Sequence, residues 1–539
     1  MVRWRVNLIL FLFFLFGAAI IGQLFYIQII HNDFYRALAQ GLYSREEDSI
    51  GERGRVFFKG GEPLAVNINW PLIFASPTEI DNKEQAAEKI ALILGLEKES
   101  ILEKISRESL YEPIKKRVSH EEVQQVENLS IKGVYIGWER GRYYPQDETA
   151  SQIIGFVDAD GEGRYGIEGH YNHLLQGKKN EPGKDITLTI DYPIQLMAEN
   201  LLAEAKENLN IEGGEVIVMQ PYSGEIMALA NYPAYNPNQY SKISDFTIFK
   251  NSATQKIFEP GSIFKPITIA AALEEEKITP QTVYTDSGSV KVGGYTIYNY
   301  DRRVWGEQTM TEVLEKSINT GVVFAESKIG HNSFLRYLED FGFFQPTGID
   351  FPEVYSENRH FKMGYEINFV TASYGQGIEM TPIQLLTSFT PVINNGKTVQ
   401  PYLVKEIKQG QTVETTKPKI SEEPIISSKT SSQLTSMLVS VTENGFAKSA
   451  RLPGYYVAGK TGTAQIAWSA LGINQRGYSD KTWQSFIGFV PAYNPEFIIL
   501  VKLNNPASRT AEYSAVPIFQ QLAKYMVDYL QIPPDYQPD

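Results

Sequence analysis

The sequence predicts an α+β fold, in which an antiparallel sheet is flanked by helices. Strand patterns stand at both ends of the segment 185–539: "DITLTID" and "GEVIVMQPYSGEIMALAN" near its start, and three strand candidates near its end. Several helical patterns lie between Ile263 and Leu386. Strands grouped at the two ends of a segment, with helices between them, are typical of this class. The composition, 42% hydrophobic and 21% charged, is that of an ordinary globular protein.

Local signals justify each element of this segment. After the strand at 185–191, Pro193 opens a helix that carries Ile194, Met197 and Leu201 on one face. The next two strands form a hairpin that turns at Pro221–Gly224. The strand candidates near the end are residues 455–465, 483–491 and 496–505, and "AYNPE" is the turn between the last two. An amphipathic helix at 518–530 follows them.

The N-terminus predicts a membrane anchor. Arg3 and Arg5 precede Leu8–Ile30, a run of 23 mostly apolar residues. As a helix this run is about 34 Å long, which is enough to cross a bilayer. A cleaved signal peptide is the alternative, with "GAA" at Gly17–Ala19 as a weak cleavage site, but apolar sequence continues beyond it. Basic residues before the run place residues 1–7 in the cytoplasm as a short tail, and everything after residue 30 outside.

The segment 31–184 is expected to form a separate domain before the catalytic one at 185–539. "RGRVFFKGGEPLAVN" at 53–67 has a strand–turn–strand pattern around Gly60-Gly61, and residues 83–108 have helical periodicity. Glu181-Pro182-Gly183 marks the boundary. The net charge of −13 argues against nucleic-acid binding. The absence of cysteine excludes thiol catalysis, disulfides and Cys-ligated zinc.

The stretch "GYYVAGKTGTAQ" at 454–465 has two interpretations. Read from Gly454 it is G-x-x-x-x-G-K-T, a phosphate-binding loop, and read from Lys460 it is K-T-G-T, part of a serine acyl-transfer site. A phosphate-binding loop needs a helix that opens at its lysine, but Thr461-Gly462-Thr463 is a poor helix start. ATP is also scarce outside the cell. We therefore favour the acyl-transfer site.

Ser262 and Lys265 are the candidate nucleophile and base. In "FEPGSIFKPITIAAALEEE", Pro260-Gly261 is a turn and an Ala-rich helix follows, so that Ser262 lies in the first helical turn. Ser262 and Lys265 are i and i+3 and share a face. An amine beside a hydroxyl can act as its base if its pKa is lowered. S-x-x-K alone is a weak signal, and a helix cap with a solvated lysine explains it equally well.

A second polar element, S-x-N, occurs twice. Ser317 and Asn319 lie at a tight break between two predicted helices, a corner that can aim side chains into a cleft. Ser356 and Asn358 lie in a charged loop after Pro352, where a solvated turn is the simplest account. We choose the first pair.

The third element is the strand "VAGKTGTAQ" itself. Alternation puts Lys460 and Gly462 on one face and Thr461 and Thr463 on the other. Gly462 allows close approach of another backbone or a ligand. The cation of Lys460 and the hydroxyls of Thr461 and Thr463, if they face a serine, could bind the carboxylate of a substrate. The alternative without a function is an edge strand with an exposed lysine.

Together these motifs resemble the penicillin-binding proteins, the serine transpeptidases of peptidoglycan. The sequences around these motifs also resemble the family: "EPGSIFKPIT", "AGKTGTAQ" and "YGQGIEMTPIQLL". Before the catalytic domain, "RGRVFFKGGEPLA", "RYYPQDETASQIIGF" and "GRYGIEG" resemble the pedestal of the class B, monofunctional branch. The resemblance implies a five-stranded antiparallel sheet flanked by helices, an elongated α+β pedestal (dimerisation-type) domain, one transmembrane helix, and no second, glycosyltransferase domain.

The resemblance also implies roles for these residues. Ser262 would attack the D-Ala–D-Ala amide of a stem peptide, and Lys265 would take its proton. Ser317, assisted by Lys460, would pass a proton to the leaving amine, and the amine of a second stem would resolve the ester. The substrate would be bound by Asn319 at its amide and by Thr461, Gly462 and Thr463 at its carboxylate, with the N–H groups of residues 262 and 463 as oxyanion hole.

The resemblance further implies that β-lactams acylate Ser262, in an enzyme of cell division or elongation without metal or cofactor. It implies a location in the bacterial inner membrane with the catalytic domain outside, and a multispanning glycosyltransferase and other divisome or elongasome proteins as partners. A D,D-carboxypeptidase or β-lactamase, and a scaffold of low activity, remain alternatives.

Some positions depart from the family pattern or invite another interpretation. Phe58 stands where an acidic residue is usual, Gln152 where His is usual, and Gly445-Phe446-Ala447 where Gly-Thr-Gly or Gly-Thr-Ala is usual. Glu168, His170 and His173 have a spacing that could hold a metal, but polar surface explains them better. Residues 467–481 are expected to form a loop beside the cleft.

Overall fold

The structure is a computed structural model that describes residues 3–30, 32, 35–36, 51–178, 181–359 and 361–537. Residues 1–2 of the predicted tail and most of residues 31–50, at the start of the predicted pedestal, lie outside the described residues. The chain forms two compact units. Unit 1 comprises residues 1–53, 66–143 and 176–182, and unit 2 comprises residues 54–65, 144–175 and 183–539.

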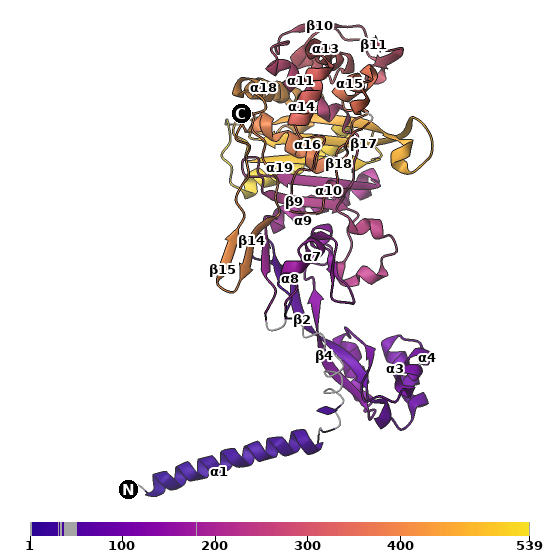
Figure 1. Cartoon of the computed structure of the whole chain (residues 1–539), viewed down its shortest axis with the longest axis vertical. Helices are drawn as coiled ribbons and strands as arrows, with labels where there is room; N and C mark the ends of the chain where they lie inside the picture. Colours follow the sequence, from indigo (N-terminus) through magenta and orange to yellow (C-terminus); the bar gives the residue numbers. More distant parts are fainter. Residues whose placement is uncertain are drawn as a thin grey trace. The chain divides into compact units, whose positions relative to one another are not determined.

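The predicted N-terminal helix is present as α1 (Arg3–Phe25), which continues as the π-helical turn η1 (Tyr26–Ile30) (Figure 1). Within it, Asn7–Ile29 is the one helix in the described part of the chain that is long and apolar enough to cross a membrane. Its leucine and phenylalanine side chains, and all its isoleucine side chains except that of Ile27, are exposed.

Unit 1 packs three helices against strands. The helices α3 (Lys83–Leu94), α4 (Lys98–Ser106) and α5 (His120–Asn128) share a core with β2 (Pro63–Ala75), β3 (Glu112–Lys115) and β4 (Val134–Tyr143). The helical periodicity of residues 83–108 therefore belongs to two helices. Gly95 separates them because it caps α3 in the left-handed region, with φ of 61°.

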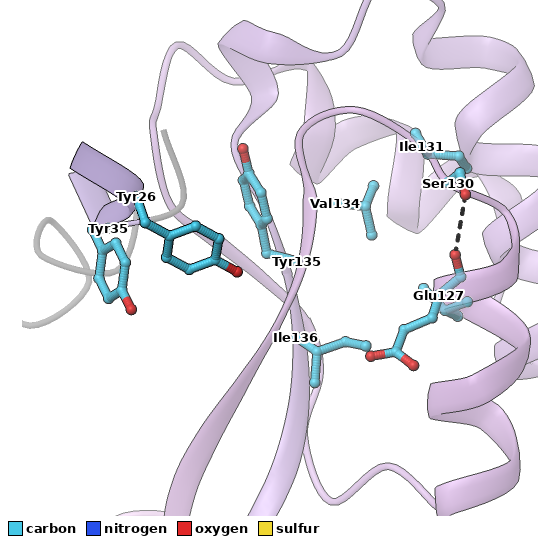
Figure 2. A pocket seen from close by; sticks show the side chains of 9 residues that line it. Tyr26, Tyr35, Glu127, Ser130, Ile131, Val134, Tyr135 and Ile136 are labelled. Carbon is cyan, nitrogen blue, oxygen red and sulfur yellow. Dashed lines mark hydrogen bonds between the residues drawn. The ribbon is translucent and has the colours of Figure 1, made fainter. Parts of the chain in front are cut away.

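The turn between α5 and β4 borders a pocket of unit 1 (Figure 2). Glu127 and Ser130 lie at the end of the helix, where the Ser130 hydroxyl donates to the carbonyl of Glu127 at 3.5 Å. Val134, Tyr135 and Ile136 line the pocket from the strand. None of the predicted site residues lines this pocket.

The first strands of unit 2 pair with segments that are far apart in the sequence. The predicted hairpin around Gly60-Gly61 forms, with β1 (Val56–Phe57) antiparallel to the start of β2. β1 also pairs in parallel with β7 (Asp185–Leu188), which pairs in turn with β14 (Val404–Gln409) of the hairpin that ends in β15 (Thr412–Thr415). Residues 54–65 and 144–175 pack in the same unit as the segment from 183 onward.

The main sheet of unit 2 has five antiparallel strands in the order β16 (Ala458–Ala467), β17 (Tyr478–Val490), β18 (Phe497–Asn504), β8 (Gly213–Met219) and β9 (Ile226–Tyr232). The expected antiparallel sheet is thus confirmed. β17 begins at Tyr478, where it pairs with Ala467, so residues 478–481 of the expected loop are strand. The 3-10 turn η9 (Trp468–Leu471) forms another part of that loop.

Helices cover both faces of this sheet (Figure 1). On one face, Phe519 of α19 (Ala515–Tyr529) packs on Phe486 of β17, and α9 (Tyr192–Leu209) lies beside α19. The other face carries α11 (Lys265–Glu274), α16 (Pro382–Ser388) and α18 (Ser428–Glu443). Lys460 and Gly462 of β16 point to this second face, so the site is assembled between the edge strand and these helices.

Candidate active site

Ser262 lies in the short 3-10 turn η5 (Gly261–Phe264), which runs directly into α11. Gly261 has a φ of +62°, and its N–H donates to the carbonyl of Gly375 at 2.9 Å. A Cβ on Gly261 would stand 2.8 Å from the Cβ of Ala464 on β16. Two close approaches, to β16 and to the loop at Gly375, thus fix the turn that presents Ser262, and they require glycine at 261.

Lys265 follows one helical turn later and is fully buried. Its Nζ donates to the carbonyl of Ser317 at 2.5 Å and to the Ser317 hydroxyl at 3.1 Å. Burial, and secondly the nearby ammonium of Lys460, hold the pKa of Lys265 well below its usual range. The lowered pKa favours the neutral amine, which is the form that can act as a base.

Ser317 forms the corner between α12 (Met310–Glu315) and α13 (Asn319–Ile329), as the sequence predicted. Its φ of +54° lies in the left-handed region, which costs a non-glycine residue free energy and is common at functional sites. Lys460 Nζ also donates to the Ser317 hydroxyl at 3.1 Å. One hydroxyl oxygen therefore lies between two lysine amines that come from opposite walls of the site.

Lys460 is fully buried on β16, and burial lowers its pKa to about 7. Its Nζ also donates to the carbonyl of Thr461 at 3.0 Å and to the Thr461 hydroxyl at 3.3 Å. Burial alternates along the strand as predicted, with Lys460 and Gly462 buried and Thr461 and Thr463 half-buried. The Thr463 hydroxyl accepts a hydrogen bond from the Ala511 N–H at 3.3 Å.

Gly462 lies directly under the turn that carries Ser262. A Cβ at this position would meet the Cβ of Ile263 and the carbonyl oxygen of Pro260 at 3.1 Å each, and the Ser485 hydroxyl at 2.6 Å. The strand can approach the turn this closely only because residue 462 has no side chain.

Asn319 opens α13, and its side-chain amide donates to the carbonyl of Tyr298 at 3.0 Å. The next residue, Thr320, donates its hydroxyl to the buried carboxylate of Asp286 at 2.7 Å, and the Asn299 amide donates to the same carboxylate. Asp286 thus fixes both the start of α13 and the loop beside Asn319. No motif marks Asp286, because its partners come from three separate segments.

The alternative motif has a structural role. Asn358 is buried in the left-handed region, and its side chain bonds to the backbone of Glu379 in both directions. Ser356 donates to the Glu379 carboxylate at 3.4 Å. This pair therefore ties one loop to another, and the structure joins Lys265 and Lys460 to Ser317 instead.

Two further interpretations find no support. Residues 458–461 are strand, and no helix opens at Lys460, so the phosphate-binding loop is wrong. Glu168 is buried and accepts a hydrogen bond from the Tyr144 hydroxyl at 3.4 Å. Among the described residues, no group of three His, Asp or Glu side chains is arranged to hold a metal ion.

The positions that depart from the family pattern are packed into the fold. Phe58 is fully buried against Tyr192, with 5.1 Å between ring centroids. The Gln152 amide donates to the carbonyls of Pro233 and Ile248 at 2.8 and 3.2 Å. The Phe446 N–H donates to the carbonyl of Glu315 at 3.2 Å, which joins the end of α18 to α12.

Two family models match the chain. The penicillin-binding protein transpeptidase domain matches residues 214–524, which is more than half of the chain, and the penicillin-binding protein dimerisation domain matches residues 49–184. Stage V sporulation protein D of Bacillus subtilis is 30% identical over 518 residues, covering 90% of this chain and 79% of that protein. The probable peptidoglycan D,D-transpeptidase PbpC of Pseudomonas aeruginosa is 29% identical over 572 residues, covering 100% of this chain and 97% of that protein.

Solved structures share the fold. Penicillin-binding protein 3 of Mycobacterium tuberculosis, in complex with aztreonam, matches with a TM-score of 0.71 at 23% identity, over 91% of this chain and 98% of that one. The expected α+β fold, a transpeptidase domain preceded by a dimerisation-type domain, is confirmed. The chain therefore belongs to the penicillin-binding proteins, in the class B branch of monofunctional peptidoglycan D,D-transpeptidases.

Proposed function

We propose that this D,D-transpeptidase works through an acyl-enzyme on Ser262, and that Lys265, Ser317 and Lys460 are its proton-transfer groups. One observation carries the assignment. Lys265 Nζ and Lys460 Nζ each lie 3.1 Å from the Ser317 hydroxyl, although they come from different elements. Ser262 is the hydroxyl one helical turn before Lys265, on a turn pressed against the strand of Lys460.

In the first step, the Ser262 hydroxyl oxygen attacks the carbonyl carbon of the D-Ala–D-Ala amide, and its proton passes to the neutral amine of Lys265. The lowered pKa of Lys265 suits this role, because a base must be unprotonated at the working pH. The tetrahedral intermediate then loses D-alanine, which takes a proton from the Ser317 hydroxyl. Lys460 donates a hydrogen bond to that hydroxyl and can replace its proton.

The second step regenerates the free enzyme. The amine of a second stem peptide attacks the ester, Ser262 regains its proton, and a new amide cross-link forms. Backbone N–H groups of Ser262 and Thr463 are the proposed oxyanion donors. β16 is the edge strand of the sheet, so one of its sides has no strand partner among the described residues and can pair with an extended peptide.

We assign substrate contacts to Asn319, Thr461, Gly462 and Thr463. Asn319 would hold the substrate amide from the start of α13. The threonine side chains are half-buried, and Thr461 already lies within hydrogen-bond distance of Lys460. That cation and the two hydroxyls suit the terminal carboxylate of the stem. β-Lactams would acylate Ser262 in the same geometry.

The test is acylation of the full chain in detergent micelles by a fluorescent penicillin, with the adduct located by mass spectrometry. We expect a stable adduct on Ser262, and none in Ser262→Ala. Release of hydrolysed drug within minutes would favour the β-lactamase alternative. A folded chain that takes no label would favour a scaffold and refute the proposed site.

A second assay separates transfer from hydrolysis. The acyl-enzyme is offered a stem-peptide donor with and without a competing amine acceptor. A transpeptidase gives the cross-linked product as acceptor is added, whereas a D,D-carboxypeptidase gives only the shortened donor and D-alanine.

We also propose that α1 anchors the chain with its N-terminus in the cytoplasm and residues from 31 onward outside the inner membrane. The basic residues Arg3 and Arg5 at the start of α1, before its apolar run, support this orientation. Because the chain has no cysteine, single cysteines report topology directly. In intact cells, Ser432→Cys should react with a membrane-impermeant maleimide, and Trp4→Cys should react only after permeabilisation. The reverse pattern would refute the orientation.

Domain division and partners follow from the same proposal. A pedestal at 31–184 and a catalytic domain at 185–539 are supported by the dimerisation-domain match, which ends at residue 184. A multispanning peptidoglycan glycosyltransferase and other divisome or elongasome proteins are the proposed partners of the anchor and pedestal. When residues 1–30 are exchanged for an unrelated single-span anchor, we expect that the glycosyltransferase no longer co-purifies with this chain from membranes.

A further inference from the structure

A row of polar residues crosses the main sheet on the face that carries the nucleophile turn. The strand registers place Gly462 opposite Ser485, Ser485 opposite Lys502, Lys502 opposite Glu215, and Glu215 opposite Asn231. Residues that are directly opposite in neighbouring strands share a face. The row therefore extends from the K-T-G strand at one edge of the sheet to β9 at the other.

A buried ion pair occupies the middle of this row. Lys502 Nζ lies 2.9 Å from Glu215 Oε2, and the side chains are only 2% and 1% exposed. The Asn504 side chain accepts a second hydrogen bond from Lys502 at 2.8 Å. The other carboxylate oxygen of Glu215 has no hydrogen-bond partner in the described structure. Burying two charges is costly and is often no more stable than an apolar pair, so stability alone does not explain this choice.

The chain segment that leads to Ser262 lies along the same row. At one end, the Asn231 side chain accepts hydrogen bonds from the Ser252 hydroxyl at 2.8 Å and the Ala253 N–H at 3.3 Å. In the middle, Lys502 Nζ stands 5.1 Å from the ring centroid of Phe258. At the other end, Gly462 lies against the turn of Ser262.

The ring of Phe258 is enclosed by its surroundings. Trp483 packs edge-on against it at 5.9 Å between centroids, and Lys502 Nζ lies 5.9 Å from the Trp483 ring. The backbone of Phe258 exchanges two hydrogen bonds with Met380, at 2.9 and 3.1 Å. A cation held against a ring without water is attracted to it more strongly than at an exposed site.

We propose that the Lys502–Glu215 pair is a positioning device for the nucleophile. Glu215 fixes the ammonium of Lys502, the ammonium fixes the ring of Phe258, and Phe258 sets where the next four residues place Ser262 over Gly462. This inference rests on the proposed function of Ser262. Neither charged residue touches substrate; both act through the segment 258–262.

The inference predicts that the pair controls the acylation step and leaves the initial binding of the drug unchanged. A shift of about 1 Å in a reacting group can cost about a hundredfold in rate. We expect a relaxed Phe258 to move Ser262 by a fraction of that, and so to lower the acylation rate constant about tenfold. The dissociation constant of the initial drug complex should stay within about twofold.

The experiment compares a single and a double variant of the full chain in detergent micelles. Lys502→Met leaves Glu215 buried without its partner, so it should lower both the melting temperature and the acylation rate. In Lys502→Met/Glu215→Met no charge is left unpaired, and the melting temperature should recover. The acylation rate of the double variant should remain about tenfold low, because the cation that holds Phe258 is absent. A double variant with the wild-type rate would overturn the inference.

Phe258→Leu gives an independent measurement if the double variant does not fold. It keeps the ion pair and removes the ring, and should lower the acylation rate with unchanged initial binding. Phe519→Leu is the matched control, because Phe519 is also fully buried on this sheet but on the α19 face. Equal acylation rates in the two variants would refute the role of Phe258.

Labelling of the wild-type chain distinguishes a failure of the proposed function of Ser262 from a failure of the positioning role alone. If it takes no penicillin label, the proposed function of Ser262 fails and the positioning role fails with it. If the wild type is labelled and the double variant is labelled equally fast, only the positioning role fails.

Discussion

Gly462→Ala is the substitution that most directly tests how the strand and the nucleophile turn fit together. The new Cβ would stand 3.1 Å from both the Ile263 Cβ and the carbonyl oxygen of Pro260. Ordinary contacts between carbon atoms are about 3.5–4.0 Å. The Ser485 hydroxyl, 2.6 Å away, can rotate aside. The backbone of the turn cannot, so it must move by about 0.5 Å relative to β16.

Two effects of that movement can be measured. The first is a loss of folding free energy of about 1–3 kcal/mol, which is the usual cost of overpacking a core. The backbone at residue 462 is extended, so alanine adds no φ strain to this cost. A displacement of 1 Å in a reacting group can cost about a hundredfold in rate, so half of that should lower acylation by about tenfold. The rate should therefore fall while most of the protein stays folded.

The assay is stopped-flow acylation of the full chain by a fluorescent penicillin, with thermal unfolding measured in parallel. Gly137→Ala is the matched control. Gly137 is also a buried strand glycine, and a Cβ there would meet the Phe74 ring at 3.1 Å in unit 1. The control should lose similar stability without losing acylation rate. If Gly462→Ala acylates at the wild-type rate, the close fit between β16 and the turn is not what positions Ser262.

Four other substitutions, at three residues, probe the lysine pair and the hydroxyl between them. Lys265→Met should lower the acylation rate by about 10²–10⁴ because the base is lost. It should also raise the melting temperature at pH 7, because a lysine whose folded pKa is lowered costs stability at every pH below its ordinary pKa of 10.5; a lower melting temperature would contradict this. The pKa of Lys460 is about 7 in the folded chain and 10.5 in the unfolded chain. Between pH 7 and 10.5 the unfolded chain therefore still holds this proton, whereas the folded chain has released it. Wild-type stability should therefore rise across this window relative to Lys460→Met, by up to about 5 kcal/mol; parallel urea-unfolding curves at pH 7 and 9.5 would contradict it. Ser317→Ala and Ser317→Gly should both lose activity, but the glycine variant should be more stable by about 1 kcal/mol because φ at 317 is +54°. Equal stabilities in chemical denaturation would rule out that strain.

Most of the fold, and the short motifs of the candidate site, were predictable because their signals are local. The apolar run at 8–30, the hairpin around Gly60-Gly61 and the strands of the main sheet follow from patterns within a few neighbouring residues. Boundaries were less predictable. The apolar periodicity of 83–108 continues on both sides of Gly95, and periodicity alone does not show that this glycine takes a left-handed conformation and ends α3. β17 extends back to Tyr478 because its pairing with Ala467 stabilises residues that have no strand pattern of their own.

The sequence by itself determined the class of fold, an N-terminal helix long and apolar enough to cross a membrane, and the short motifs of Ser262, Ser317 and Lys460, because periodicity and motif spacing are properties of adjacent residues. Only the tertiary structure decided how these motifs meet. Lys460 and Ser317 are separated by 143 positions, and Lys502 and Glu215 by 287. Whether such residues touch depends on strand order and register. Strand order and register also set how far apart the amines lie and how deeply they are buried, and this burial lowers their pKa values. The local sequence encodes the chemical groups, and the packing of the sheet against its helices determines their reactivity.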